Sequence, residues 1–100
     1  MTGMTNAISK HLHVKSYTFP NTDLDSGYYI ELEYNVSSSD GTPIGIVGYR
    51  IANYTTPGYC SYCTAYNASI DGAKACIYIR NHNSSHKAKI AVTVYILCEN

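Results

Sequence analysis

The stretch from Pro43 to Asn53, Pro-Ile-Gly-Ile-Val-Gly-Tyr-Arg-Ile-Ala-Asn, decides the predicted fold. In a strand, its apolar side chains fall on both parities, with Ile44 and Ile46 on one and Val47, Tyr49 and Ile51 on the other. Such a strand needs cover on both faces, so the pattern predicts a central strand. The glycines within it are typical of bulges or of close backbone approach in a tightly packed sheet.

Alternation predicts strands along the rest of the chain. The cleanest runs over residues 28–36, and we expect it to pair antiparallel with the 43–53 strand. Further strands are expected at residues 10–19, 59–70, 74–80 and 87–98, separated by turn sequences such as residues 20–27 and the hairpin signal Asp71-Gly72. No window has a helical period. The sequence therefore predicts an all-β fold, an antiparallel β-sandwich or jelly-roll-like domain of about six or more strands.

The length of 100 residues predicts one domain, over residues 10–100, preceded by a polar tail or lead-in over residues 1–9. Seven basic and seven acidic side chains cancel, which disfavours nucleic acid as a partner. No apolar run approaches the roughly 20 residues of a membrane span, so membrane insertion is not expected either.

Four cysteines raise the question of metal binding or redox chemistry. Cys60 and Cys63 have the spacing of a metal knuckle or a redox pair, but Cys76 and Cys98 stand singly and do not complete a zinc ribbon. Free thiols, one or two disulfides, and a metal site all remain possible. With no export signal in the sequence, we expect reduced, metal-free thiols.

No catalytic pattern emerges from the polar residues, so we expect a protein that is not an enzyme and that needs no cofactor. Of the four histidines, His11 and His13 lie two apart on one strand face, a spacing that can chelate a metal, whereas His82 and His86 bracket a turn. Glu31 and Glu33 lie two apart on one strand face and resemble a carboxylate pair. Solvated strand faces and turns are the favoured explanation of all of these groups.

Tyrosine is abundant, with eleven copies against one phenylalanine and no tryptophan. Rings and amides together form adaptable contact surfaces that suit a saccharide or a subunit interface. Tyrosine filling half-buried sheet faces is the alternative. The predicted ligand-binding residues are Asn53, Tyr54, Tyr59, Tyr62, Tyr66, Asn81, His82 and Asn83. Surplus apolar positions predict an oligomer interface at Val47, Tyr49, Ile51, Tyr95 and Leu97.

Several motifs together resemble a known family. They are Ser26-Gly27-Tyr28, the run from Asp40 to Tyr49, Ile79-Arg80-Asn81 and the closing strand from Ile90 to Leu97. This order is similar to the C-terminal β-sandwich (head) domain of tail-fibre and receptor-binding proteins of phages and prophages of Gram-positive bacteria, over nearly the whole chain after Ser9. The resemblance implies a homotrimer that binds a cell-surface saccharide. It also implies a virion component that is assembled in the bacterial cytoplasm and released by lysis.

Two hypotheses follow for the function. One is a non-enzymatic adhesion module that attaches a phage tail fibre, or a similar particle, to carbohydrate on the host surface. The other is a purely structural module that trimerises or decorates the particle. They differ in whether the tyrosines around residues 54–66 are exposed or lie between subunits.

Overall fold

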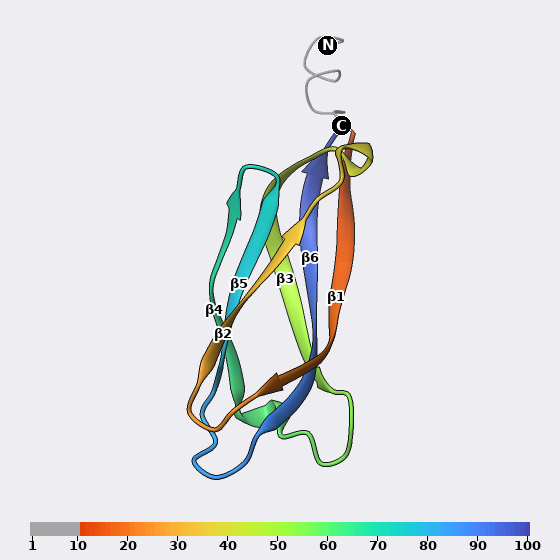
Figure 1. The fold of residues 1–100 in the computed structure, drawn as a ribbon. Helices are drawn as coiled ribbons and strands as arrows, with labels where there is room; N and C mark the ends of the chain where they lie inside the picture. The colour runs from red at the N-terminus through yellow and green to blue at the C-terminus, as the bar shows by residue number, and fades with distance from the viewer. Residues whose placement is uncertain (1–10) are drawn as a thin grey trace, which may run out of the picture.

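The computed structural model describes residues 11–100, whose strands form two antiparallel three-stranded sheets (Figure 1). Sheet A has the order β1-β6-β3 and sheet B the order β2-β5-β4. The strands are β1 (Leu12–Leu24), β2 (Tyr29–Asn35), β3 (Thr42–Asn53), β4 (Cys63–Asp71), β5 (Lys74–Asn81) and β6 (Ala88–Glu99). Two short 3-10 turns, η1 (Ser38–Asp40) and η2 (Cys60–Tyr62), are the only helical segments in the described part of the chain. The all-β prediction is confirmed, with six strands in residues 11–100.

The core lies between the inner faces of the two sheets, an arrangement compatible with a β-sandwich. From sheet A, every second residue of β6 from Ile90 to Cys98 is buried. From sheet B, Ala75, Ile77 and Ile79 of β5 are buried. Burying a side chain such as isoleucine contributes about 1.5 to 3 kcal/mol. The two middle strands therefore supply most of the buried apolar surface.

The prediction that residues 43–53 form a central strand is wrong. β3 is an edge strand of sheet A, and β6 is the middle strand, paired with β1 on one side and β3 on the other. The predicted pairing of residues 28–36 with β3 is also wrong, because β2 pairs with β5 in the other sheet. Apolar side chains on both parities of β3 mark an edge strand with one face left exposed.

The bulges predicted from the glycines of β3 are confirmed. Its register against β6 shifts between Pro43 and Gly45 and again between Ile46 and Gly48. At each shift two residues face a single partner, so Ile44 joins Gly45, and Val47 joins Gly48, on the side that faces away from sheet B. Both added side chains are exposed.

The first strand is longer than predicted, because β1 continues through residues 20–24, which the sequence assigned to a turn. A bulge between Phe19 and Thr22 carries it past Pro20. The Asp71-Gly72 hairpin is confirmed, with Gly72 at a φ of 63° in the connection between β4 and β5. The predicted tail over residues 1–9 lies outside the described residues. Within residues 11–100, no helix has the length and apolar character to cross a bilayer.

Candidate functional site

The outer face of sheet B brings tyrosine and charged side chains from three strands together. The inward parity of β2 and β5 carries the core, so the opposite parity must face solvent. Register then aligns side chains across the three strands. Tyr78 in β5 lies between Glu31 in β2 and Tyr66 in β4. In the next row, Arg80 lies between Tyr29 and Thr64.

Three rings on this face, those of Tyr29, Tyr78 and Tyr66, form what we call the tyrosine row. The rings of Tyr66 and Tyr78 are stacked with centroids 5.3 Å apart, and those of Tyr29 and Tyr78 are 6.1 Å apart. Tyr29 is 60% exposed and Tyr66 is 36% exposed. Ring pairs at these spacings stabilise each other while leaving part of each π face open. The row offers a continuous aromatic strip on an open sheet surface.

Glu31 forms a hydrogen bond with the hydroxyl group of Tyr78, the middle ring of the row. The charge of Glu31 and its hydrogen bond with the Tyr78 hydroxyl raise the pKa of Tyr78. The tyrosine hydroxyl, which is protonated at neutral pH, donates this hydrogen bond to the carboxylate. The row thus combines apolar ring faces with a carboxylate, a guanidinium and a hydroxyl from Glu31, Arg80 and Thr64.

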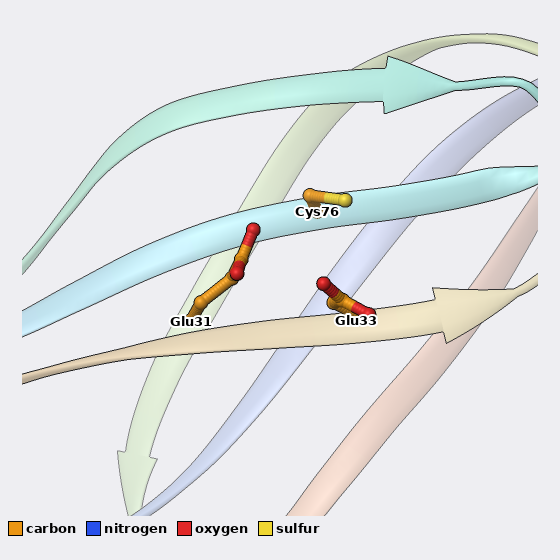
Figure 2. A group of neighbouring side chains, drawn as sticks. All are labelled: Glu31, Glu33 and Cys76. Atoms are coloured by element: carbon orange, nitrogen blue, oxygen red, sulfur yellow. The ribbon is translucent and has the colours of Figure 1, made fainter.

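Beside the row, Glu31, Glu33 and Cys76 bring their oxygen and sulfur atoms within 4.8 Å of one another (Figure 2). The Lys74 ammonium group lies 3.3 Å from the Glu33 carboxylate, and the hydrogen bond between them raises the pKa of Lys74. Burial, followed by the charges of Glu33 and Glu31, raises the pKa of the Cys76 thiol. A metal ion would have to displace the lysine and the thiol proton. The predicted carboxylate pair therefore forms an acidic, lysine-paired surface beside the tyrosines.

A second aromatic group lies in the segment between β3 and β4, where Tyr59 adopts a left-handed conformation with a φ of 59°. Its ring stacks on His86 at 4.5 Å and lies 6.2 Å from the ring of Tyr62. The Asn53 side chain anchors this segment by accepting a hydrogen bond of 2.8 Å from the Cys60 amide. Asn53 therefore has a structural role beside the aromatic group.

Tyr54 does not belong to this aromatic group, because its hydroxyl interacts with β1. Its hydroxyl donates to the Asp23 carboxylate of β1, and this hydrogen bond is the main reason why the pKa of Tyr54 is raised. Its ring is 37% exposed. Tyr54 thus links the end of β3 to β1.

Asn81 and Asn83 are buried and serve the loop that joins β5 to β6. Asn81 donates to the carbonyl oxygens of Leu24 at 3.0 Å and His86 at 2.9 Å, and accepts from the Asn83 amide at 2.9 Å. Asn83 in turn accepts from the amides of Ser85 and His86. Both residues are buried and their side-chain oxygens are engaged within the loop, so neither belongs to the candidate site.

The predicted ligand-binding residues therefore divide into two groups. Tyr66 belongs to the tyrosine row, and His82 lies at its edge with Nε2 at 2.8 Å from the Thr64 hydroxyl. Tyr59 and Tyr62 belong to the second group, with His86. Sequence reasoning missed Tyr29, Tyr78 and Arg80, because each lies on a parity that also carries charged residues. Only the cross-strand register brings them together.

The predicted interface residues also separate. Val47, Tyr95 and Leu97 lie on the outer face of sheet A, where Val47 is exposed and the other two are half-buried. Ile51 is half-buried and packs against the core, and its role in an interface stays a prediction. Tyr49 follows the inner parity of β3 opposite Val94, yet its side chain is 50% exposed. The exposed side chain is therefore available for a contact at the edge of the sheet.

All four cysteines are free in the structure. Cys63 is buried, and its thiol donates to the Tyr59 carbonyl at 3.9 Å. Cys98 is also buried, and its thiol donates to the Ile96 carbonyl at 3.8 Å. Burial raises the pKa of both thiols, with smaller contributions from Cys60 on Cys63 and from Asp40 on Cys98. That all four thiols are reduced and free of metal in solution stays a prediction.

One further hollow of about 240 Å³ lies near the start of β3, between the η1 turn and the β4–β5 hairpin. Its lining is formed by Val36, Ser38, Gly41, Thr42, Pro43, Gly72 and Ala73. None of these carries a titratable side chain. The hollow therefore offers no acid, base or nucleophile other than hydroxyl groups.

No protein-family model, curated protein or solved structure matches this chain. Its function therefore has to be inferred from its own side chains. Among the described residues, the tyrosine row is one of three groups of three neighbouring rings, and it is the one that lies on the outer side of a sheet beside Glu31, Arg80 and Thr64.

Proposed function

We propose that this chain is a non-enzymatic adhesion module that binds saccharide on a bacterial cell surface through the outer face of sheet B. The fold proposed for it is a six-stranded β-sandwich, and its setting is a phage tail fibre or a similar particle, as the sequence resemblance implies. The tyrosine row, with Glu31, Arg80 and Thr64 beside it, is the observation that carries the proposal.

Sugar chemistry explains why this surface fits. A pyranose ring has an apolar C–H face that stacks on an aromatic ring, and a rim of hydroxyl groups that needs donors and acceptors. Tyr29 and Tyr66 supply open ring faces, while Glu31 accepts and Arg80 donates at the rim. A chain with no net charge has no long-range preference for charged polymers. A neutral or zwitterionic cell-wall polysaccharide is the expected ligand class.

An open sheet face binds weakly, so affinity has to come from several copies acting together. The resemblance implies three copies, and the trimer remains a prediction. We therefore expect immobilised or multivalent glycan to bind much more tightly than free sugar.

The test is a glycan array of bacterial cell-wall polysaccharides probed with wild type, Tyr29→Ala and Tyr66→Ala. Each variant should bind roughly tenfold more weakly, because each removes one stacking ring. Tyr17→Ala is the matched control, since Tyr17 and Tyr66 are equally exposed, at 36%, but Tyr17 lies in β1 of sheet A and is not among the predicted interface residues. Loss of binding in Tyr62→Ala but not in Tyr29→Ala would move the site to the second aromatic group.

A purely structural role is the second candidate, and a separate observation favours it. The outer face of sheet A exposes apolar side chains that a particle subunit can use for assembly. A chain that binds no polysaccharide on the array but forms a defined oligomer would favour this role over adhesion.

A further inference from the structure

Three acceptor atoms meet at one end of the tyrosine row, and we call them the acceptor group. They are a carboxylate oxygen of Glu31, a carboxylate oxygen of Glu33 and the Cys76 sulfur, and they lie within 4.8 Å of one another. Figure 2 shows the two carboxylates of β2 beside the Cys76 side chain of β5. Both glutamates are exposed, so a ligand in solution can reach the group. Because Glu31 also accepts from the Tyr78 hydroxyl, the acceptor group adjoins the middle ring of the row.

The acceptor group carries more negative charge than its neighbours balance. Its two carboxylates share one cation, the Lys74 ammonium group, which lies 3.3 Å from the Glu33 carboxylate. Asp71, opposite Lys74 in the ladder, adds a further negative charge. Glu31 forms no ion pair with another residue of the described chain. A further positive charge beside Glu31 is therefore favourable.

Cys76 is a polar side chain without a partner at the base of this group. It is 7% exposed, and its thiol has no hydrogen-bond partner within residues 11–100. Sulfur is a weak acceptor. A buried thiol that faces two carboxylates therefore leaves one acceptor for a donor that enters from outside.

A primary ammonium group matches these three acceptors. It has three N–H donors. Three acceptors that each lie about 2.9 Å from a tetrahedral nitrogen are about 4.7 Å apart, which fits the separation within the group. A metal ion would need the thiol proton to leave, whereas an ammonium group uses the acceptors as they are. Hydrogen bonds from a cation to a carboxylate are also about twice as strong as neutral ones.

We propose that the acceptor group binds a primary ammonium group of the saccharide, such as that of an amino sugar without an acetyl group. This inference rests on the proposed function, and it selects the zwitterionic class of polysaccharide over the neutral one. Arg80 supplies the complementary charge, because it is exposed and forms no ion pair with any side chain that the structure describes. Its row adjoins that of Glu31 and Tyr78, about 7 Å along the strand. One sugar can therefore place its ammonium group at the acceptor group and a phosphate or carboxylate near Arg80.

The test uses the full chain and two matched probes, glucosamine 6-phosphate and N-acetylglucosamine 6-phosphate, each displayed on the same multivalent carrier. They differ only in the acetyl group, which removes the charge and two of the three donors of the ammonium group. Wild type should bind the ammonium form at least roughly tenfold more tightly. The cell-wall polysaccharides of the glycan array are spotted untreated and after N-acetylation, which should weaken their binding by a similar factor.

Glu31→Gln should remove the preference for the ammonium form, because glutamine keeps an oxygen for the Tyr78 hydroxyl but loses the charge. Asp23→Asn is the matched control, since Asp23 also accepts from a tyrosine hydroxyl, that of Tyr54, but lies in β1 of sheet A. This variant should keep the preference. Lys74→Gln should strengthen binding of the ammonium form, because it removes the cation that competes for Glu33. Circular dichroism of each variant checks that the fold is intact.

Equal binding of the two probes, failure of both probes to bind, or array binding that survives N-acetylation would overturn the ammonium site. So would a preference that persists in Glu31→Gln or disappears in Asp23→Asn. Adhesion through the tyrosine row would still stand in these cases, provided that Tyr29→Ala and Tyr66→Ala weaken binding on the array. If no polysaccharide binds in either form, the proposed function falls together with this inference.

Discussion

At the scale of single residues, Asn81 shows how one buried amide organises a surface loop. Its side chain is fully buried and bonds to Leu24, His86 and Asn83, so it ties the end of β1 to the loop between β5 and β6. That loop positions His86 against Tyr59. The sequence predicted a ligand-binding role for Asn81, because a sequence does not distinguish an exposed asparagine in a polar turn from one whose amide bonds within the protein.

We predict that Asn81→Ala lowers the free energy of unfolding by about 2 to 4 kcal/mol, because buried carbonyl and amide groups lose their partners. Urea denaturation followed by circular dichroism measures the change. Asn35→Ala is the matched control, since Asn35 is exposed at the end of β2, and it should change stability by less than about 0.5 kcal/mol. Equal losses in the two variants would contradict the structural role of Asn81.

The four thiols should differ in reactivity. Cys60 is only partly buried, whereas Cys63, Cys76 and Cys98 are buried and burial raises the pKa of each. Since the thiolate is the reactive form, we expect alkylation of the native protein to modify Cys60 first. Mass spectrometry after brief treatment should find one label. After unfolding without reductant it should find four, and fewer than three would indicate disulfides or bound metal.

At the scale of elements, the bulge in β4 decides which side chains face solvent. The hairpin at Gly72 alone would pair Tyr66 with Ile79, a core residue, if the ladder ran without interruption. The register shift between Tyr66 and Ser69 instead pairs Tyr66 with Tyr78. A one-residue slip moves a whole strand segment to the other face. Asn67, at a φ of 50°, is the one local signal for this bulge, because asparagine tolerates the left-handed region.

The segment after β3 also depends on close backbone approach. The Lys89 amide donates to the Gly58 carbonyl at 2.9 Å, which holds the segment against β6. A Cβ at Gly58 would lie 2.6 Å from the Lys89 carbonyl oxygen and 2.5 Å from the Asn53 Oδ1. This contact involves backbone that cannot move without disturbing β6. Any larger residue would clash here, so this position requires glycine.

Gly58→Ala should lower the free energy of unfolding by about 1 to 3 kcal/mol, through the clash with β6. Gly45→Ala is the comparison, because a Cβ at Gly45 meets nothing within 4 Å. That variant should be neutral or more stable by up to about 1 kcal/mol, since alanine restricts the unfolded chain. Thermal unfolding of both variants measures the two changes in stability. A destabilised Gly45→Ala with an unaffected Gly58→Ala would refute the spatial argument.

At the scale of the whole molecule, local pattern and long-range pairing carry different information. The alternation in β5 and β6 is strong enough to predict their inner faces, since Ile77, Ile79 and Ile90 are all fully or almost fully buried. Which strands pair is not a local property: β2 and β3 are neighbours in sequence but lie in different sheets. The tyrosine row depends on that pairing and on the β4 bulge together. Of the three rings in the tyrosine row, only Tyr66 could therefore be proposed from the sequence.

The buried thiols also predict how stability depends on pH. The thiols of Cys63, Cys76 and Cys98 have a pKa raised above the ordinary 9.0, chiefly by burial. In alkaline solution the unfolded chain releases these protons first, so it binds fewer protons than the folded chain, and stability falls as pH rises. The pKa of Tyr78 is also raised, by Glu31, so its titration above pH 10.0 lowers stability in the same direction.

The free energy of unfolding, from urea denaturation with reductant present, should therefore be lower at about pH 10 than at about pH 8. Cys98→Ala should reduce this slope, although the cavity it leaves lowers stability at every pH. An unchanged or increased stability at the higher pH would show that these thiols do not remain protonated in the folded protein.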